Sequence, residues 1–422
     1  IINARHFLNN TIYITAAYEK TENLVHLSSK TLIGGMEMIE YSVPADFTNE
    51  TILRYDDLNH SYSNCRVTET YGQISMGQPI GSGRANDLLP EVDDSLLGAY
   101  IEQSKRYNIH FNYTLNTTCL GNMEFHDEGR DIIYDFLKRL KKLGVTRLTV
   151  AMPSLIEFIK LSGLGFEIKA STVCMINNPN KAMLFENLGV KRMVLDESIN
   201  RSFDILADIR NSISIPVELI VNVVCHQDCV YEWYHHNQKS HDFNSNKDTR
   251  SATYYSHRCI MRRLETAESI LKLGWIRPED IPYYTRLGIR HFKIQGRQAV
   301  THGDPVKAVQ AYMDQRYEGN FMDLLDMFSP TNSFRICIDN SSLDGFIQPF
   351  VDKPGFCHRN CGKCGYCKGY MERKMDTKAI RIMNDKALHF YNEYDEFINA
   401  AKKYVSDEEK ESAVLGDFSF LA

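Results

Sequence analysis

Short apolar runs recur along the middle of the chain, and stretches with helical spacing separate them. A Leu-Gly-Val or Leu-Gly-Ile phrase opens the segments 143–147, 188–192 and 287–291, and a strand-like apolar run follows each phrase. A glycine at that place is typical of the C-cap that ends a helix before a strand begins. Because apolar residues at helical spacing precede the phrases, the pattern predicts alternating helices and strands.

Several segments have the length and composition of β-strands. They are residues 12–17, 32–40, 71–76, 109–116, 147–152, 166–172, 191–196, 216–222 and 289–296. About eight strands joined by helices favour an α/β protein with a (β/α)8 TIM-like barrel. A doubly wound open sheet is the alternative, but no glycine-rich dinucleotide-binding loop follows any of these segments.

The pattern changes near residue 303, so the sequence predicts two parts. Residues 1–302 are expected to form the barrel, and residues 303–422 a C-terminal extension. The extension begins with a helical segment near 304–317, passes through a Pro-, Asn- and Ser-rich stretch at 329–355, and ends in a charged helical tail after 374. We expect it to be a cysteine-rich appendage held by a metal or cluster.

Several predicted strands carry polar residues on one face only, with apolar residues on the other. Strands of a parallel barrel are buried on both faces, so the polar face is expected to point into the lumen. Buried polar groups are costly unless they are paired, so the lumen holds either a paired network or a ligand cavity, and we favour the cavity. An antiparallel sheet with one wet face is the alternative. The predicted catalytic residues are Asn112, Lys169, Glu218 and Lys293.

Further polar residues near the strand ends are candidates for substrate binding. A cationic Lys or Arg at the mouth of the barrel would suit an anionic co-substrate such as a carboxylate. The predicted substrate-binding residues are Asn116, Asn222 and Arg297, with Arg84 and Arg201 as further candidates for binding an anion.

Charge and composition exclude some classes of partner. The chain has 48 Lys and Arg against 54 Asp and Glu, which gives a net charge of -6 and no global positive field for nucleic acid. A dense basic run at 138–147 is better explained as the solvated face of an amphipathic helix. No run is long and apolar enough to span a membrane, and the first residues do not resemble a signal peptide, so we expect a cytoplasmic protein.

Three of the 11 cysteines fall in one stretch after a predicted strand. Cys225 and Cys229 follow the strand at 216–222, and Cys259 lies 30 residues beyond Cys229. The loop after a barrel strand forms the catalytic mouth. We predict a metal site there, an iron-sulfur cluster or zinc, with Cys119 as the fourth ligand. The alternatives for the fourth ligand are Cys174, Cys65, or a non-cysteine ligand such as the loop histidines 226, 235, 236, 241 and 257.

A second group of cysteines lies in the C-terminal extension. Cys357, Cys361, Cys364 and Cys367 have the spacing x3, x2, x2, which contains the C-x2-C-x2-C run of ferredoxin-like cluster binding. Four thiols in one short loop predict a second iron-sulfur cluster, with zinc as the alternative. Such a site would serve as an electron relay or as a structural staple.

Several phrases together resemble the collagenase-like peptidase family, family U thirty-two. They are residues 111–116, 196–201, 218–229, 256–259, 275–280 and 292–297, and the likeness covers roughly residues 70 to 300. The resemblance implies a (β/α) barrel with a 4Fe-4S cluster held by four cysteines, three of which match Cys225, Cys229 and Cys259. It also implies one of two activities: the peptidase of the family name, or oxygen-independent hydroxylation of ubiquinone precursors or RNA pyrimidines with prephenate as the oxygen source.

The motifs favour redox chemistry over proteolysis. The chain has no Gly-x-Ser-x-Gly elbow and no His-Glu-x-x-His helix. We therefore predict an iron-sulfur oxidoreductase that hydroxylates a small molecule or peptide without oxygen, using an anionic co-substrate such as prephenate and a protein partner or electron donor. The alternatives are an RNA-modifying pyrimidine hydroxylase, a metallopeptidase-like hydrolase and a non-catalytic, cluster-bearing partner subunit.

Overall fold

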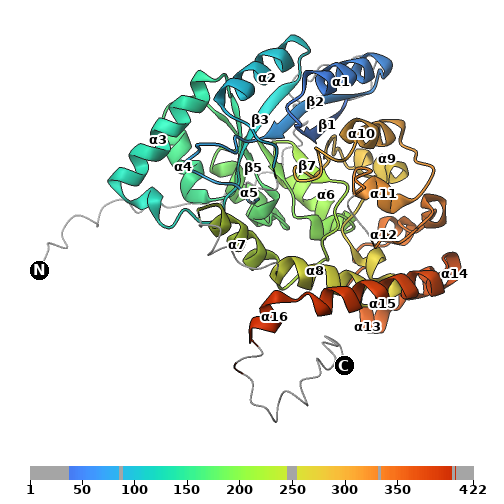
Figure 1. Ribbon diagram of the computed structural model, residues 1–422. Helices are drawn as coiled ribbons and strands as arrows, with labels where there is room; N and C mark the ends of the chain where they lie inside the picture. Colours follow the sequence, from blue (N-terminus) through green and yellow to red (C-terminus); the bar gives the residue numbers. More distant parts are fainter. Residues whose placement is uncertain (1–37, 85–88, 245–253, 331–333, 402–403, 405–422) are drawn as a thin grey trace, which may run out of the picture. The chain divides into compact units, whose positions relative to one another are not determined.

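Eight parallel strands close into a barrel in the order β1 to β8. The computed structural model describes residues 38–84, 89–244, 254–330, 334–401 and 404. The strands are β1 (Ile39–Pro44), β2 (Cys65–Gly72), β3 (His110–Leu115), β4 (Arg147–Val150), β5 (Glu167–Ala170), β6 (Arg192–Val194), β7 (Val217–Ile220) and β8 (His291–Lys293). Pairing of β1 with β8 closes the sheet, which confirms the predicted (β/α)8 barrel (Figure 1).

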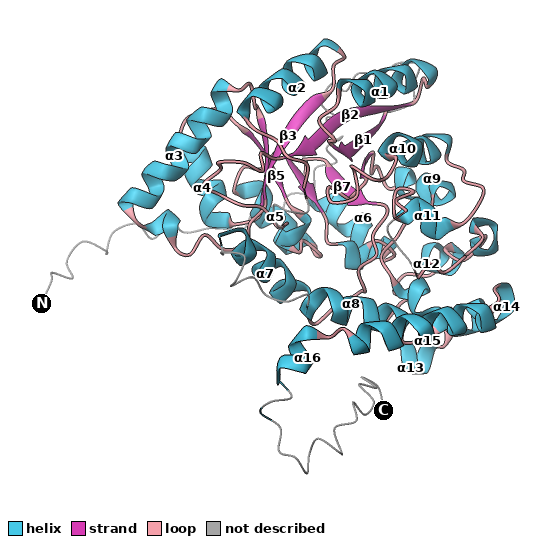
Figure 2. Ribbon diagram, in the orientation of Figure 1, coloured by secondary structure: helices cyan, strands magenta, loops and turns pink. Residues whose placement is uncertain are grey.

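Helices follow the strands and surround the sheet (Figure 2). They are α1 (Asn49–Ser61), α2 (Asp94–Arg106), α3 (Asp127–Lys142), α4 (Pro153–Leu161), α5 (Pro179–Asn187), α6 (Phe203–Ser212), α7 (Glu232–Asn244), α8 (Tyr254–Leu264) and α9 (Ile281–Arg286). Gly144, Gly189 and Gly288, the glycines of the recurrent phrase, have φ of 92°, 87° and 75°. These left-handed conformations end α3, α5 and α9, as the phrase predicts.

The core lies between the sheet and this ring of helices. In α3, Ile133, Phe136, Leu137 and Leu140 are buried on one face, and the opposite face is exposed. The strands contribute the other half of the layer through residues such as Tyr113, whose ring packs 6.0 Å from the ring of Phe136. Apolar residues at helical spacing therefore select the face that packs on the barrel.

Most predicted strands correspond to observed ones. The six segments from 109–116 onward each contain a strand, β3 to β8. The segment 12–17 and the first part of 32–40 lie outside the described residues, and β1 begins at Ile39. The prediction of a strand at 71–76 was wrong, because β2 covers Cys65–Gly72. Because Arg66 and Glu69 are charged, the sequence of β2 resembles that of a polar loop. In the structure, however, Glu69 is buried in the lumen.

The C-terminal extension packs against the barrel. Its helices are α10 (Pro305–Asp314), α11 (Phe321–Leu325), α12 (Gln348–Asp352), α13 (Cys361–Cys364), α14 (Tyr366–Lys374), α15 (Thr377–Glu393) and α16 (Glu396–Ala401). The hydroxyl of Tyr41 in β1 donates to the carbonyl of Tyr312 in α10 at 2.7 Å. From Met38 onward the described residues belong to one compact unit. The division at residue 302 stays a prediction.

None of the helices in the described part of the chain combines the length and apolar character needed to cross a bilayer.

Candidate functional site

The inside of the barrel holds a set of paired charges. Lys169 of β5 forms ion pairs with Glu69 of β2 and, at 2.7 Å, with Glu218 of β7. All three side chains are almost completely buried. The pairs cross the lumen because the polar faces of these strands point inward, as the sequence predicts. We call Glu69, Lys169, Glu218 and the groups that bond to them the floor network.

Neutral polar groups extend the floor network around the sheet. Ser42 of β1 donates to Glu69 at 2.9 Å, and the amide of Asn112 in β3 donates to Glu69 at 3.3 Å. Thr149 of β4 donates in turn to the amide oxygen of Asn112 at 2.6 Å. The network therefore links most strands of the barrel through buried hydrogen bonds.

The floor network keeps its carboxylates ionised. Burial raises the pKa of Glu69 and Glu218, but Lys169 and Arg192 lower it further, so both pKa values lie below the usual range. Of the four predicted catalytic residues, Asn112, Lys169 and Glu218 lie in this network and do not line the cavity at the mouth of the barrel. The charges of Lys169 and Glu218 are paired with each other, and the amide of Asn112 is hydrogen-bonded to Glu69. These residues therefore stabilise the inside of the barrel.

A cavity lies directly beyond the floor network, at the C-terminal mouth of the barrel. Its volume is about 1020 Å³, counting the part that is open to solvent. The wall includes residues two positions after those of the floor network: Tyr71, Thr114, Val194 and Ile220 on four strands, and Ser171 directly after β5. Helices α7 and α8 contribute residues such as Glu232, His235 and Cys259, and the loops after the strands complete the wall.

Lys293, the fourth predicted catalytic residue, does line this cavity. Its Nζ lies 3.7 Å from the centroid of the Tyr71 ring and makes no hydrogen bond or ion pair with a described residue. Burial lowers the pKa of Lys293 to about 8, although Glu218 and Glu69 raise it. A lysine with such a pKa exchanges protons near neutral pH.

Two arginines share the same wall. Arg297 is buried and donates to Gln73 at 2.6 Å and to Ser82 at 3.1 Å, which fixes its guanidinium in place. Burial and the neighbouring Arg84 lower the pKa of Arg297 to about 10. Arg84 also lines the cavity. Three cationic side chains therefore face one space, which is the arrangement that an anionic ligand requires.

Three of the predicted metal ligands reach the cavity. Cys225 and Cys229 belong to the loop after β7, and Cys259 lies on α8. Cys229 and Cys259 are half-buried. The structure thus brings together three thiols that are up to 34 residues apart in the chain.

The other cysteines proposed for this site do not line the cavity. Cys119 follows β3, but its sulfur accepts a hydrogen bond from the amide of Gly121 within its own loop, at 3.3 Å. Cys174 is buried and donates to the carbonyl of Ala151 at 3.3 Å. Cys65 is the first residue of β2 and so lies at the opposite end of the barrel. Among the residues that the structure describes, no fourth cysteine therefore lines this cavity.

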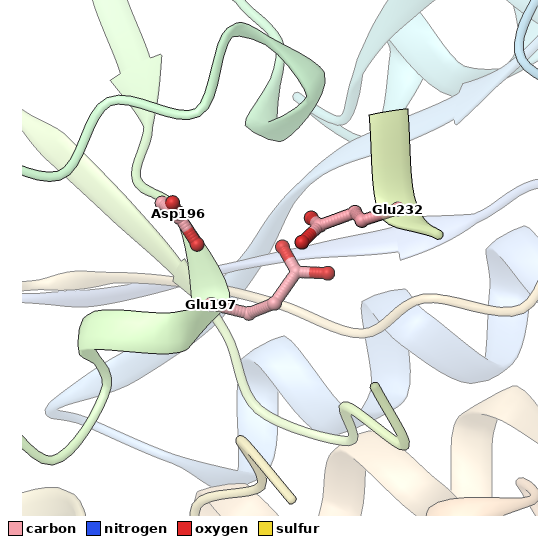
Figure 3. Close-up of side chains that lie close together, drawn as sticks. All are labelled: Asp196, Glu197 and Glu232. Atoms are coloured by element: carbon pink, nitrogen blue, oxygen red, sulfur yellow. The ribbon is translucent and has the colours of Figure 1, made fainter. Parts of the chain in front are cut away.

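Three carboxyl groups meet at the mouth, as Figure 3 shows. Cys225 lies close to two of them, Glu197 and Glu232. Asp196 and Glu197 follow β6, and Glu232 begins α7. One oxygen of each lies within 4.8 Å of the others. In the described ranges, no other set of three or more His, Cys, Asp or Glu residues converges so closely. The carboxyls of Glu197 and Glu232 point toward each other, which is unfavourable unless protons or a cation lie between them.

Burial and mutual repulsion weaken the acidity of this group. Burial raises the pKa of Glu232 to about 9, and Glu197 and Asp196 add to the rise. Burial likewise raises the pKa of Glu197 and of the Cys225 thiol, which lies close enough to Glu197 and Cys259 for both to raise it further. The mouth therefore contains several acidic groups whose ionised forms a positive centre would stabilise.

The loop histidines are divided between two environments. His226, His235 and His236 line the cavity, and burial lowers their pKa values to about 3, 3 and 4. A neutral imidazole can bind a metal ion through the lone pair of a ring nitrogen. The Nε2 atom of His226 is buried and has no hydrogen-bond partner among the described residues. His241 and His257 are not part of the lining.

The remaining predicted binding residues have different surroundings. Asn116 lines the cavity. Asn222 instead holds the loop after β8 in place, because its amide donates to the carbonyl of Gln295 at 2.9 Å. Arg201 lies beneath the C-terminal extension, with its guanidinium 4.1 Å from the centroid of the Trp275 ring. Asn222 and Arg201 therefore do not face the cavity.

Sequence reasoning did not assign the carboxyls Glu197 and Glu232 to the site. A usable signal existed for Glu197, because it follows a predicted strand directly and so belongs to the mouth of the barrel. Glu232 lies three residues after Cys229, at the start of a helix that the sequence pattern did not resolve. Tyr71 was missed because β2 itself was misplaced.

The C-terminal cysteines gather around a second cavity. Cys357, Cys361, Cys364 and Cys367 all line it, together with aromatic residues such as Phe350 and Phe356. Cys361 and Cys364 belong to the short helix α13 and are exposed. The four predicted ligands of the second site are thus close together.

Comparison with known proteins gives a consistent result. The model of peptidase family U32 matches residues 91–334. A protein of Methanocaldococcus jannaschii named "Uncharacterized protease MJ1657" is 31% identical over 343 residues, which are 81% of this chain and 100% of that protein.

Solved structures match the chain at lower sequence identity. The U32 peptidase Mk0906 has 15% sequence identity and a TM-score of 0.46, covering 64% of this chain and 96% of that one. A 3-hexulose-6-phosphate synthase has 13% identity and a TM-score of 0.34, covering 66% of this chain and 100% of that one.

Proposed function

The chain belongs to peptidase family U32, and on that premise we propose that it is an enzyme with an iron-sulfur centre at the mouth of its barrel. The proposed reaction is an oxidoreduction, the oxygen-independent hydroxylation of a small molecule or peptide. The observation that carries the proposal is the convergence of Cys225, Cys229 and Cys259 on one cavity that also holds buried acidic and cationic groups.

The donor set fits an iron-sulfur centre better than a single zinc ion. A tetrahedral zinc with Zn–S bonds of about 2.3 Å holds its sulfurs about 3.8 Å apart. No three described cysteine sulfurs lie within 4.8 Å of one another. The cysteines of a cluster bind different irons and stand farther apart. When bound, such a cluster supplies one-electron redox chemistry or a Lewis-acidic iron.

The fourth ligand in this proposal is not a cysteine. Glu197, Glu232 and His226 line the same cavity as the three thiols. The Cys225 thiol hydrogen-bonds to Glu197, and the Nε2 atom of His226 lacks a partner among the described residues. One of these three side chains would complete the ligand set, and Glu232 would exchange a proton close to the centre.

The cationic wall supports an anionic substrate or co-substrate. Lys293, Arg84 and Arg297 would bind carboxylate groups, and prephenate is a molecule of this class. Arg297 is held rigidly by Gln73 and Ser82, so it would orient the anion. Lys293 would donate or accept a proton at its Nζ during the reaction.

Metal analysis of cysteine variants tests this proposal. Protein purified without oxygen is analysed for iron, acid-labile sulfide and zinc, as wild type and as Cys225→Ser. The exposed Cys337→Ser is the matched control. We expect Cys225→Ser to lose about four irons and their sulfide, and Cys337→Ser to lose none. Equal iron in all three proteins, or zinc without sulfide, would contradict the proposal.

A metal-dependent hydrolase is the second candidate, and the carboxyl trio favours it. Asp196, Glu197 and Glu232 bring three oxygens within 4.8 Å, a set suited to a divalent cation that activates water. The family name and the relative named a protease agree with hydrolysis. Peptide cleavage that depends on added Mn²⁺ or Zn²⁺, and that Glu232→Gln abolishes, would support this candidate over the first.

A further inference from the structure

The cysteine loop of the C-terminal extension touches the cysteine loop of the barrel mouth. The sulfur of Cys357 lies 3.9 Å from the amide oxygen of Gln227, and Arg359 forms an ion pair with Asp228. Gln227 and Asp228 lie between Cys225 and Cys229 in the chain. The two cysteine groups are thus joined by direct contacts between their own loops.

A second bond strengthens this junction. The guanidinium of Arg359 also donates to the carbonyl of Ser198 at 3.2 Å, next to Glu197 of the mouth. Arg359 adopts a φ of 59°, a left-handed conformation that costs free energy for a residue other than glycine. The contacts to Asp228 and Ser198 hold the loop in this conformation.

The cavity beside the four C-terminal cysteines has the character of a cluster site. All four thiols line it, together with Phe350, Phe356, Lys272 and Lys368. In the part of the chain that the structure describes, no three of these thiols come within 4.8 Å of one another, which is wider than a single zinc ion requires. The aromatic rings would shield an anionic cluster from solvent, and the lysines would balance its charge.

A buried cation lies next to this site, and no carboxylate among the described residues forms an ion pair with it, although Asp280 is near enough to interact with its charge. Arg201 is 3% exposed and donates only to the backbone carbonyls of Leu271 and Trp275. Its Nε atom has no hydrogen-bond partner within the described ranges, and the side chain shares a cavity wall with Cys357. Thiolates bound to iron at Cys357 would add negative charge beside the buried guanidinium.

From these contacts we infer that Cys357, Cys361, Cys364 and Cys367 bind a second iron-sulfur cluster, which passes single electrons to the mouth of the barrel. This inference rests on the proposed iron-sulfur centre there. Each transfer oxidises the C-terminal cluster by one electron and reduces the mouth centre by one, and no covalent bond forms or breaks. A one-electron donor protein re-reduces the C-terminal cluster through its exposed side, where Cys361 and Cys364 reach solvent.

Iron content in two variants separates the two sites. Wild type, Cys361→Ser/Cys364→Ser and Cys225→Ser are purified without oxygen, with Cys337→Ser as the control. We expect about eight irons in the wild type and the control and about four in each variant. Cys361 and Cys364 are exposed, so their replacement spares the core, and circular dichroism checks that each variant is folded.

The outcomes distinguish the two claims. A wild type with about four irons that only Cys225→Ser loses would overturn the second cluster and leave the mouth centre standing. About four irons that only Cys361→Ser/Cys364→Ser loses would overturn the mouth centre instead. Zinc in place of iron at the C-terminal cysteines would overturn the relay.

Electron paramagnetic resonance of the reduced protein tests the contact between the sites. Two nearby paramagnetic clusters broaden each other's signals. We expect the fully reduced wild type to show this broadening and both single-site variants to lose it. If the wild-type spectrum equals the sum of the two variant spectra, the clusters are too far apart and the relay is overturned.

Discussion

The barrel interior contains two layers of charged residues, which differ in whether their charges are paired. In the floor network, Lys169 is matched by Glu69 and Glu218, and hydrogen bonds complete the set. Two residues farther along the strands, Lys293 has no ion pair with a described residue, and the carboxyls of Glu197 and Glu232 face each other. The same residue types are therefore paired in one layer and lie in the wall of the cavity without such pairing in the next.

The contrast teaches how to separate structural from functional charges in a barrel. Floor charges have pKa values that favour their ionised forms, as for Glu218. Mouth groups have pKa values shifted toward their neutral forms, as for Lys293 at about 8 and Glu232 at about 9. Pairing relieves the cost of burial in the floor, whereas the mouth retains that cost until a ligand or metal binds.

The largest effect is expected when the floor network is broken. Lys169→Met would leave Glu69 and Glu218 buried without their central partner, so we expect the free energy of unfolding to fall by about 3–5 kcal/mol. Urea unfolding followed by circular dichroism measures this change. A loss below about 1 kcal/mol would show that the floor pairs are not structural.

A smaller effect is expected on ligand binding at the mouth. Lys293→Met would remove a charged hydrogen bond to an anion, so we expect prephenate to bind more weakly by about 1.5–3 kcal/mol. Wild-type affinity should also fall as the pH rises through about 8, where Lys293 loses its proton. Calorimetric titration at pH 7 and pH 9 measures both effects.

Lys307→Met is the matched control for that titration. The Nζ of Lys307 also lies over an aromatic ring, 3.9 Å from the centroid of Phe328, but the residue is outside the cavity. Equal losses of affinity in the Lys293 and Lys307 variants would contradict an anion site at the mouth.

The same mouth substitution is expected to stabilise the fold. The pKa of Lys293 is lower in the folded protein than in the unfolded chain, so its charged form destabilises the protein below about pH 8. We expect Lys293→Met to unfold with a free energy about 1–3 kcal/mol higher at pH 7. This gain should shrink as the pH rises toward 10, because the wild-type lysine is then neutral in the folded state. Urea unfolding at pH 7 and pH 9.5 checks the sign, and a destabilised variant at pH 7 would contradict it.

The smallest effect is expected at an exposed ion pair. Arg316 and Glu318 have side chains that are 74% and 79% exposed. Solvent screens such a pair, so Arg316→Gln should change the free energy of unfolding by less than about 0.5 kcal/mol. A change as large as that of Lys169→Met would mean that burial does not distinguish these pairs.

Much of the barrel could be predicted from the sequence, because its strands are short and its helices end in glycine. The phrase at 143–147 and its repeats mark the helix ends at Gly144, Gly189 and Gly288. Strand β2 escaped prediction because its inward face carries Glu69, whose burial depends on Lys169, a partner 100 residues away. Local patterning cannot reveal such a pair.

The residues of the site that could be predicted from the sequence are those that follow a strand, because the ends of the strands form the mouth of the barrel. Cys225 follows β7 and lines the cavity, as that rule predicts. Cys119 follows β3 in the same way, but the amide of Thr118 donates to Ser240 of α7 at 2.9 Å, and Cys119 itself does not line the cavity, although Asn116 of the same loop does. The direction of a loop depends on such contacts, which the sequence does not display. The same limit left open whether Asn112, Lys169 and Glu218 form a network or line a cavity.

The central claim is that the unmatched groups of the mouth hold an iron-sulfur centre. An anomalous difference map at the iron absorption edge, from crystals grown without oxygen, tests this claim most directly. We expect an iron peak bounded by Cys225, Cys229 and Cys259. A map with no iron among these three thiols, or with zinc in its place, would contradict it.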